Sequence, residues 1–418
     1  MHQLNTTKDL DALLIDIGDK PVVMLGEASH GTHEFYTWRT AIAKRLIEEK
    51  NFSFIAVEGD WPDCYKINRY VKGHKDGDNI RDVLMNFDRW PTWMWANWEV
   101  AALAEWLREH NKNLPADKKI GFYGLDVYSL WDSMYAMMDY LKNEDPQAAQ
   151  AVKKAIQCFE PYAENEQLYA RYSLTEHSCR DKVLALLKEI RMKAQFLDGD
   201  REAGFNAEQN ALIAVNAEKY YTAMMRFDNE SWNVRDHHMM ETLDRLLTFH
   251  GKNTKGIVWE HNTHIGDARA TDMKKAGMIN IGQLAREQYG INKVYLAGFA
   301  SYEGTVIAGD EWGAPMQELE VPPARTASIE DVLHKESPAN RYILFSDGLT
   351  EKMYETAIHH RAIGVVYDPA REKFGNYVPS VLAERYDALI FLDQTEALHP
   401  LHLHPHGQKM PETYPFGL

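Results

Sequence analysis

The chain is poor in cysteine and contains no long apolar run, and both absences narrow its class. Its three cysteines, Cys64, Cys158 and Cys179, are odd in number and lack the spacing of a metal site. A reducing cytoplasm is the environment that such cysteine usage favours. The first residues lack the charged segment and apolar run of a signal peptide, and no run approaches the length of a membrane span. We therefore expect a cytoplasmic protein that does not enter a membrane.

The chain also has fewer basic than acidic residues. Lys and Arg together number 46 and Asp and Glu 62, which gives a net charge of −16. This negative balance argues against binding to nucleic acid or to anionic membranes, because their phosphates would be repelled. The composition, 45% hydrophobic and 26% charged over 418 residues, is ordinary for a globular protein with a large core. That length suits one large domain with an insertion, or two domains.

Several motifs that mark catalysis or nucleotide binding are missing. The chain has no GxSxG nucleophile elbow, no Walker loop, no GxGxxG run and no HExxH helix. A serine nucleophile and the use of a nucleotide therefore gain no support. The segment from His30 to Glu34 has the residue types of HExxH in a different order. We accordingly expect His33 to be a supporting residue and not a metal ligand.

Apolar runs that stop at an acid or a histidine recur along the chain. The first, Val22–Leu25, breaks at Gly26 into a loop that carries Glu27 and His30, and a helix is predicted over 35–49. Further strands are predicted at 52–57, 119–123, 256–260, 294–299, 341–345, 362–366 and 387–392, with a helix at 99–110. Ligands of open α/β sheets bind outside the carboxyl ends of the strands. We therefore look for chemistry in the residues that follow these strands.

The pattern becomes helical between residues 129 and 250. Gly and Pro are sparse there, and Ala, Leu, Met, Glu and Lys recur at helical spacing, which predicts four to six helices. We predict an α/β fold with a mostly parallel central sheet flanked by helices, and a large all-helical insertion or side lobe. Residues 1–128 and 251–418 would form the catalytic core and 129–250 the insertion. The tail from 399, rich in Pro and His, is predicted to be irregular.

The loops after the first and fourth strands combine acids with imidazoles. If these strands are neighbours in the sheet, three imidazoles and two carboxylates would line one crevice: His30, His261, His264, Glu27 and Glu58. An imidazole can take a proton from water, and a carboxylate can orient the ring. Arg39, on the helix after the first loop, would stabilise a developing oxyanion or hold the carboxylates.

Two other functions fit the same residue types. Histidine and glutamate also bind zinc or iron, so a metal-dependent hydrolase with Glu27, His30, His261 and His264 as ligands is one alternative. A small-molecule or haem binding protein that keeps these residues without turnover is the other.

Four separated motifs carry a resemblance to a known family. They are Gly26–Gly31 with Arg39 downstream, Val57–Gly59, the Asn-x-Arg-Asp segment within Trp232–Met239, and Glu260–Gly266. Together they resemble the erythromycin esterase family, whose members are often labelled succinoglycan biosynthesis proteins, over the stretch from Val22 to Thr395. Characterised members hydrolyse macrolide lactones and confer antibiotic resistance. The resemblance therefore implies a hydrolase of a carboxylic ester or lactone.

The same resemblance implies roles for individual residues. His30 would be the general base that activates water, supported by Glu27, Arg39, Glu58, His261 and His264. No metal and no other cofactor is implied, and the expected partner is a small-molecule ester or lactone. An α/β core with a helical side lobe is the implied fold. We add three candidates for substrate binding, Trp61, Asp126 and Arg235, and make no prediction of the oligomeric state.

Overall fold

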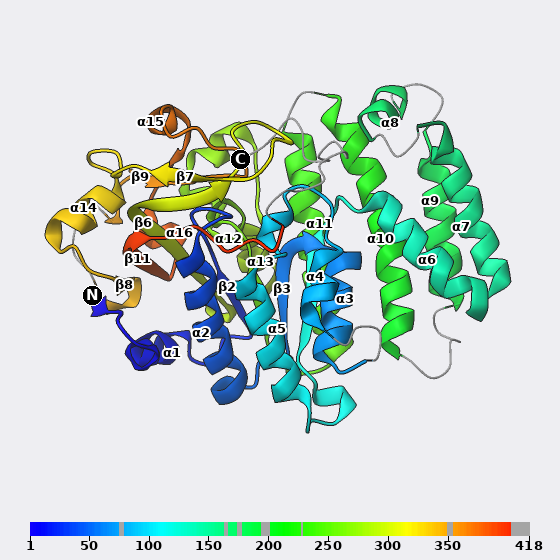
Figure 1. The fold of residues 1–418 in the computed structure, drawn as a ribbon, viewed down its shortest axis with the longest axis horizontal. Helices are drawn as coiled ribbons and strands as arrows, with labels where there is room; N and C mark the ends of the chain where they lie inside the picture. The colour runs from blue at the N-terminus through cyan, green and yellow to red at the C-terminus, as the bar shows by residue number, and fades with distance from the viewer. Residues whose placement is uncertain are drawn as a thin grey trace. The chain divides into compact units, whose positions relative to one another are not determined.

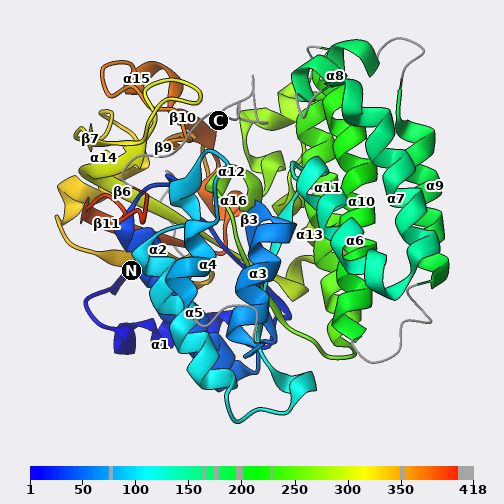
Figure 2. The same ribbon diagram turned by 45° about the vertical axis from the view of Figure 1, so that its right-hand side comes forward.

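The chain divides into two compact units, each described here by itself. The computed structural model describes residues 1–74, 79–162, 166–173, 178–193, 201–226, 229–348 and 354–402. The first unit comprises Met1–Glu58, Ile67–Phe122 and His250–Leu418, and the second Gly59–Lys66 and Tyr123–Phe249. Figures 1 and 2 draw the described chain as a ribbon from two directions.

A nine-stranded sheet lies mostly within the first unit (Figure 1), and residues 59–60 and 123–126 of two of its strands belong to the second. Its strand order is β1-β8-β11-β6-β2-β5-β3-β4, and β7 pairs with β6 beside this path. The strands are β1 (His2–Gln3), β2 (Val22–Leu25), β3 (Phe54–Asp60), β4 (Gly121–Asp126), β5 (Gly256–Trp259), β6 (Val294–Ala308), β7 (Gln317–Val321), β8 (Arg341–Leu344) and β11 (Ala388–Thr395). The pairs β11–β6, β6–β2, β2–β5 and β5–β3 are parallel. The predicted α/β fold with a mostly parallel sheet is confirmed.

The central strands are apolar along their whole length because both faces of the sheet are covered. Every residue of β2 and of β5 is buried, as expected for a parallel sheet with helices on both sides. The first unit contains α1 (Asp11–Ile17), α2 (His33–Lys50), α4 (Ile80–Met85), α5 (Trp98–Asn111), α12 (Asn262–Ile265), α13 (Ile281–Tyr289), α14 (Ile329–Glu336), α15 (Glu372–Gly375) and α16 (Leu382–Arg385). Helix α3 (Trp61–Val71) runs from the second unit into the first.

One predicted strand is wrong. The segment 362–366 forms only isolated bridges, and the strand lies earlier, at β9 (Ile358–Arg361), paired with β10 (Tyr377–Ser380). The reason is that the backbone of 362–366 bonds to separate loops and not to one ladder: the N–H of Ala362 donates to Asn376 and that of Ile363 to Ala28. The helices predicted at 35–49 and 99–110 are confirmed as α2 and α5.

The described part of the second unit contains six α-helices between residues 130 and 250, which confirms the predicted number. They are α6 (Leu130–Glu144), α7 (Pro146–Phe159), α8 (Glu166–Ser173), α9 (Arg180–Lys193), α10 (Arg201–Met224) and α11 (Glu230–His250). Figure 2 shows α6, α7, α9 and α10 lying side by side. Their apolar faces enclose a core of their own, which includes Met134, Val152, Leu186, Ala214 and Tyr221.

The cysteines of this unit differ from the sequence expectation. Cys158 and Cys179, 21 residues apart, form a disulfide, whereas the number and spacing of the cysteines favoured a reducing cytoplasm. Cys64 is the free cysteine of the described chain and is buried in α3. The pairing could not be foreseen because no local pattern reports that Cys158, in α7, lies beside Cys179, just before α9. A cytoplasmic location stays a prediction, and this bond argues against a strongly reducing environment.

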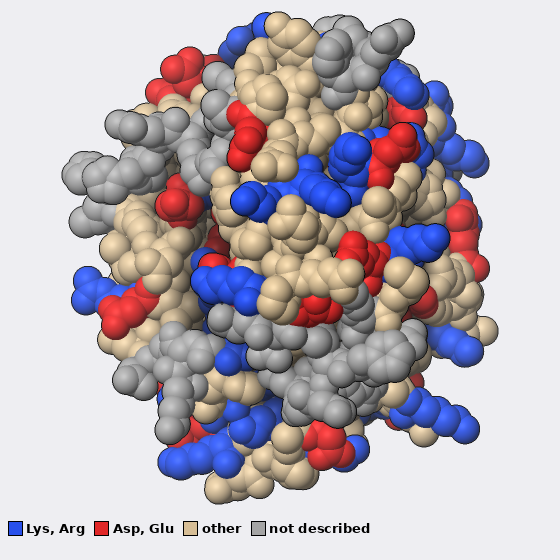
Figure 3. All heavy atoms as spheres, turned by 90° about the vertical axis from the view of Figure 1, so that its right-hand side faces the viewer, with Lys and Arg blue, Asp and Glu red and all other residues tan. Residues whose placement is uncertain are grey.

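Surface charge and helix hydropathy bear on the expected partners. On the face drawn in Figure 3, Lys and Arg side chains are interspersed with Asp and Glu. Ion pairs on the second unit, such as Lys142–Asp139 and Arg191–Glu208, bring the two signs into contact.

In the described residues, every helix is too short or too polar to cross a membrane. The absence of nucleic-acid binding stays a prediction. Of the predicted irregular tail, residues 399–402 belong to no helix or strand, and the rest lies outside the described residues.

Candidate active site

The order of the strands brings three polar segments to one edge of the sheet. Strand β2 lies between β6 and β5, and β5 pairs on its other side with β3; all of these pairs are parallel. The residues that follow β2 and β5, and the end of β3, therefore lie side by side. The backbone joins them directly, because the N–H of Asn262 donates to the carbonyl of Glu27 at 2.8 Å. The condition that the sequence left open, that these strands are neighbours, is met.

Glu27 links an imidazole to a guanidinium inside the protein. Its Oε1 lies 3.0 Å from Nδ1 of His30, and its Oε2 accepts a hydrogen bond from Arg39 at 2.5 Å. Arg39 lies on α2, where its Nε also donates to the carbonyl of Phe35, one turn earlier. The side chains of Arg39 and Glu27 are 0% and 1% exposed. Because a carboxylate accepts at Nδ1, the proton of a neutral His30 lies on Nδ1, and the basic lone pair lies on Nε2.

His261 has the opposite arrangement of its ring nitrogens. The N–H of Thr263 donates to Nδ1 of His261 at 3.2 Å, so Nδ1 is an acceptor and a neutral ring carries its proton on Nε2. Among the described residues, Nε2 makes no hydrogen bond of good geometry, although a weaker contact of the ring with the backbone of Ala28 acts to raise its pKa. Burial, aided by the adjacent His30 ring, lowers the pKa of His261 well below its usual range. Both effects favour a neutral ring, and we assign its proton to Nε2.

Glu58 holds the His261 segment in place. Its Oε2 accepts from the backbone N–H of His261 at 2.9 Å, and its Oε1 lies 3.5 Å from Nε2 of His264. The backbone carbonyl of Glu58 in turn accepts from the indole of Trp95 at 2.9 Å. The rings of His30 and His261 lie 4.9 Å apart between centroids. The six side chains predicted to be catalytic are thus gathered in one buried cluster, and their roles stay predictions.

Asn262 locks this cluster to the sheet, a role that the sequence analysis missed. Its Nδ2 donates to the carbonyl of Phe299 at 2.7 Å and lies 3.3 Å from Nε2 of His360, whose Nδ1 is 2.7 Å from Glu330. His360 and Glu330 are fully buried, and burial lowers the pKa of His360. At Gly26, an added Cβ would overlap Oδ1 of Asn262. Glycine is therefore required where the two loops meet.

His360 could have been found from the run His359–Arg361, which places an imidazole and a guanidinium next to each other in the sequence. The misplaced strand at 362–366 left this run outside any predicted strand. Glu330 carries no comparable signal, because its contact with His360 joins residues 30 positions apart.

The three candidates for substrate binding belong to the second unit. Trp61 is 0% exposed, donates to Asn206 at 2.7 Å and stacks on Tyr123. Packing accounts for its position, so we leave it out of the proposed site. Asp126 and Arg235 form a bidentate ion pair, with N–O distances of 2.9 and 2.7 Å. Their part in substrate binding stays a prediction.

A cavity adjoins this buried cluster on the side of His261. Its volume is about 310 Å³, at the lower end of the range for small-molecule sites. Most of its wall is apolar or small, and the residues that matter most for a ligand are His261, Thr263, Met273, Met278, Val366 and Tyr377. A small acyl or alcohol group placed in this cavity would contact His261, to whose Nε2 we assign the ring proton.

Residues 47–395 match the family model described as erythromycin esterase. The chain belongs to the erythromycin esterase family. The matched stretch begins after Arg39, so Glu27, His30 and Arg39 lie outside it. Membership of this family supports hydrolase activity, and the predicted family is confirmed.

Relatives and solved structures agree with this family. An Escherichia coli protein named erythromycin esterase type II is 24% identical over 369 residues, covering 82% of this chain and 85% of that protein. A putative hydrolase, YbfO of Bacillus subtilis strain 168, is 20% identical over 93% of this chain and 86% of its own length. The fold is shared with a succinoglycan biosynthesis protein (22% identity, 95% of both chains, TM-score 0.77) and with a mutant erythromycin esterase, EreC, in its open conformation (14% identity, 94% and 95% covered, TM-score 0.69).

Proposed function

We propose that this protein hydrolyses a carboxylic ester or lactone, with His30 as the general base and without a metal ion. The observation that carries the proposal is the opposite hydrogen-bond pattern at Nδ1 of two neighbouring imidazoles, from which we assign their proton positions. Glu27 fixes the proton of His30 on Nδ1, and Thr263 fixes that of His261 on Nε2. One ring is thereby prepared to accept a proton and the other to donate a hydrogen bond.

In the proposed reaction, the oxygen of a water molecule attacks the carbonyl carbon of the substrate while Nε2 of His30 takes a proton from that water. The negative charge that develops on the carbonyl oxygen receives a hydrogen bond from Nε2–H of His261. Collapse of the tetrahedral intermediate breaks the bond to the alcohol oxygen, which takes the proton back from His30. The products are a carboxylic acid and an alcohol, joined in one molecule when the substrate is a lactone.

Arg39 acts in this scheme through Glu27. The sequence left two roles for Arg39, stabilising an oxyanion or holding the carboxylates, and the contact with Oε2 of Glu27 favours the second. The guanidinium also stacks on Tyr36 and Trp259, 4.5 and 4.8 Å from the ring centroids. Its position is therefore set by three buried partners, and Arg39 is a positioning residue for Glu27.

The spacing of the cluster argues against the metal-dependent alternative. A metal ion needs ligand atoms about 2 Å from one point, so three of them must lie within a few ångströms of one another. In the described chain, the one group of histidines and acids that meets a limit of 4.8 Å is His33, Glu99 and His399. The set of Glu27, His30, His261 and His264 does not meet it.

A hydrolysis screen tests the proposal. Aryl esters, small lactones and macrolides are offered to the purified protein with and without a chelator, and the small substrates are the first choice because of the cavity volume. We expect His30→Ala to lower kcat by roughly 10²- to 10⁴-fold. His110→Ala, which alters a partly exposed histidine in the last turn of α5 that stacks on Trp106, is the matched control and should keep its activity.

Each other result points to a different function. Full activity in His30→Ala would overturn the assignment of the base. Activity that a chelator removes and zinc restores would favour the metal-dependent hydrolase. Failure to hydrolyse any substrate, with a haem Soret band that disappears in His30 or His261 variants, would favour the binding protein.

A further inference from the structure

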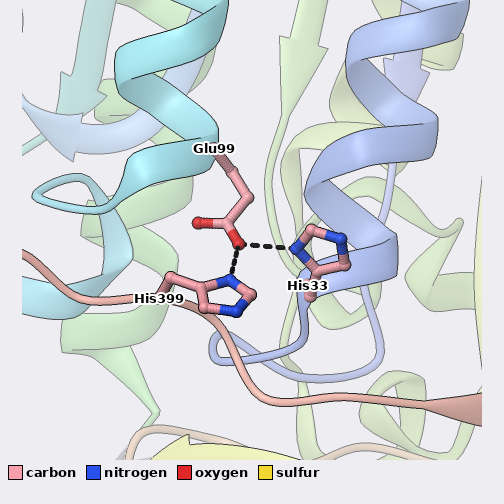
Figure 4. A group of neighbouring side chains, drawn as sticks. All are labelled: His33, Glu99 and His399. Carbon is pink, nitrogen blue, oxygen red and sulfur yellow. Dashed lines mark hydrogen bonds and ion pairs between the residues drawn. The ribbon is translucent and has the colours of Figure 1, made fainter.

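A second group of histidines and an acid lies outside the proposed catalytic cluster. Nδ1 of His33 and Nδ1 of His399 both contact Oε1 of Glu99, at 2.6 and 2.7 Å (Figure 4). The two rings are 5.2 Å apart and nearly perpendicular. One ligand atom from each residue lies within 4.8 Å of the others. Three separate segments of the chain therefore converge on one point.

Backbone pairing holds these segments in register. The C-terminal strap, residues 396–401, hydrogen-bonds to the first loop on one side: His33 N–H donates to Glu396, and Leu398 N–H to Gly31. On its other side it bonds to the start of α5, where Trp98 N–H donates to His399 and Leu401 N–H to Ala96. The Cα atoms that carry the three side chains are thus placed by the fold, which is the preorganisation that a metal site requires.

The charge and exposure of the group suit a cation. Glu99 is buried, its side chain 4% exposed, while His33 and His399 are 32% and 58% exposed. In the described structure, Oε2 of Glu99 has no hydrogen-bond partner. A divalent ion would neutralise this buried carboxylate, and the partly exposed histidines leave its outer side open to water.

The geometry points to a binding site for a divalent transition-metal ion of the zinc class at His33, Glu99 and His399. Two imidazoles and one carboxylate form a ligand set typical of zinc, with one position left for water. Calcium and magnesium are disfavoured because they prefer oxygen ligands only. The ligand atoms, now joined by hydrogen bonds, must separate to about 3.4 Å around a tetrahedral ion, which rotation of the exposed rings can provide. His33 is then a ligand, and not the supporting residue that the sequence suggested.

Zinc binding by the full-length protein tests this site. The protein is treated with a chelator, desalted and titrated with zinc chloride in a calorimeter. We expect one equivalent to bind and the midpoint of thermal unfolding to rise with added zinc. Cobalt in place of zinc should give the intense visible bands of four-coordination. His33→Gln and His399→Gln should each weaken zinc binding by at least about tenfold. Because the side chain of His33 is partly exposed and that of His399 exposed, these variants are expected to fold, as circular dichroism will check.

A matched control addresses the other histidines of the C-terminal end. A triple variant, His402→Ala with His404→Ala and His406→Ala, removes imidazoles that could chelate zinc by themselves, and we expect it to bind zinc as the parent does. Loss of binding in this variant, equal binding in His399→Gln and the parent, or no zinc bound by the parent would each overturn the proposal. Because the readout is binding, its failure is distinguishable from failure of the proposed hydrolysis.

Discussion

Replacing Glu27 by Gln is the sharpest test of how the cluster is held together. The change keeps the shape of the side chain and removes its charge, which leaves the Arg39 guanidinium without an ionic partner. Both side chains are essentially unexposed, so solvent cannot compensate. Removing one partner of a buried ion pair costs about 3–5 kcal/mol, and we expect Glu27→Gln to lower the free energy of unfolding by that amount. Urea denaturation followed by circular dichroism and tryptophan fluorescence measures it.

A double-mutant cycle separates the ion pair from other effects of the substitution. Arg39→Met alone leaves a buried carboxylate, whereas Glu27→Gln with Arg39→Met leaves neither charge, so the double variant should lose less stability than the sum of the two single losses. Glu48→Gln, on the exposed face of α2, is the control and should change stability by less than about 0.5 kcal/mol. Strictly additive losses would refute the reasoning. Glu27→Gln should also lower kcat by roughly 10²-fold or more, because the proton of His30 is no longer confined to Nδ1.

Three further predictions concern other parts of the molecule. Reduction of the Cys158–Cys179 bond, or its replacement by serines, should destabilise the helical unit by about 3 kcal/mol, from the 21-residue separation; equal urea midpoints with and without reductant would contradict this. Burial lowers the pKa of His238 from 6.5 to about 4, so unfolding takes up a proton below pH 6.5 and stability falls as pH drops towards 4, by about 3 kcal/mol. His238→Gln should flatten this dependence in urea midpoints measured at pH 7 and 4.5; an unchanged slope would count against it. Gly26→Ala should displace Asn262, cost about 1–3 kcal/mol and reduce hydrolysis; a fully active, equally stable variant would show that the loops have room.

The sequence by itself determined the local features of this protein. Apolar runs followed by Glu27 and His30, or by His261 and His264, predict strands and the polar loops after them. The length of an apolar run and the residues that end it are properties of neighbouring residues, so they can be seen in the sequence. The helical stretch of 129–250 is readable for the same reason. The predicted strand at 362–366 failed because its backbone bonds to separate loops, and no local pattern reports that.

Only the tertiary structure decided which distant residues meet. Because β2, β5 and β3 are neighbours, the loops after β2 and β5 and the end of β3 form one cluster. Strand order depends on long-range packing that a local pattern does not encode. The same holds for Cys158 with Cys179, for Glu330 with His360, and for His33, Glu99 and His399. Such contacts join residues 21 to 366 positions apart. The sequence therefore predicted which residue types surround His30, and the fold supplied the distances between them on which the proposed reaction depends.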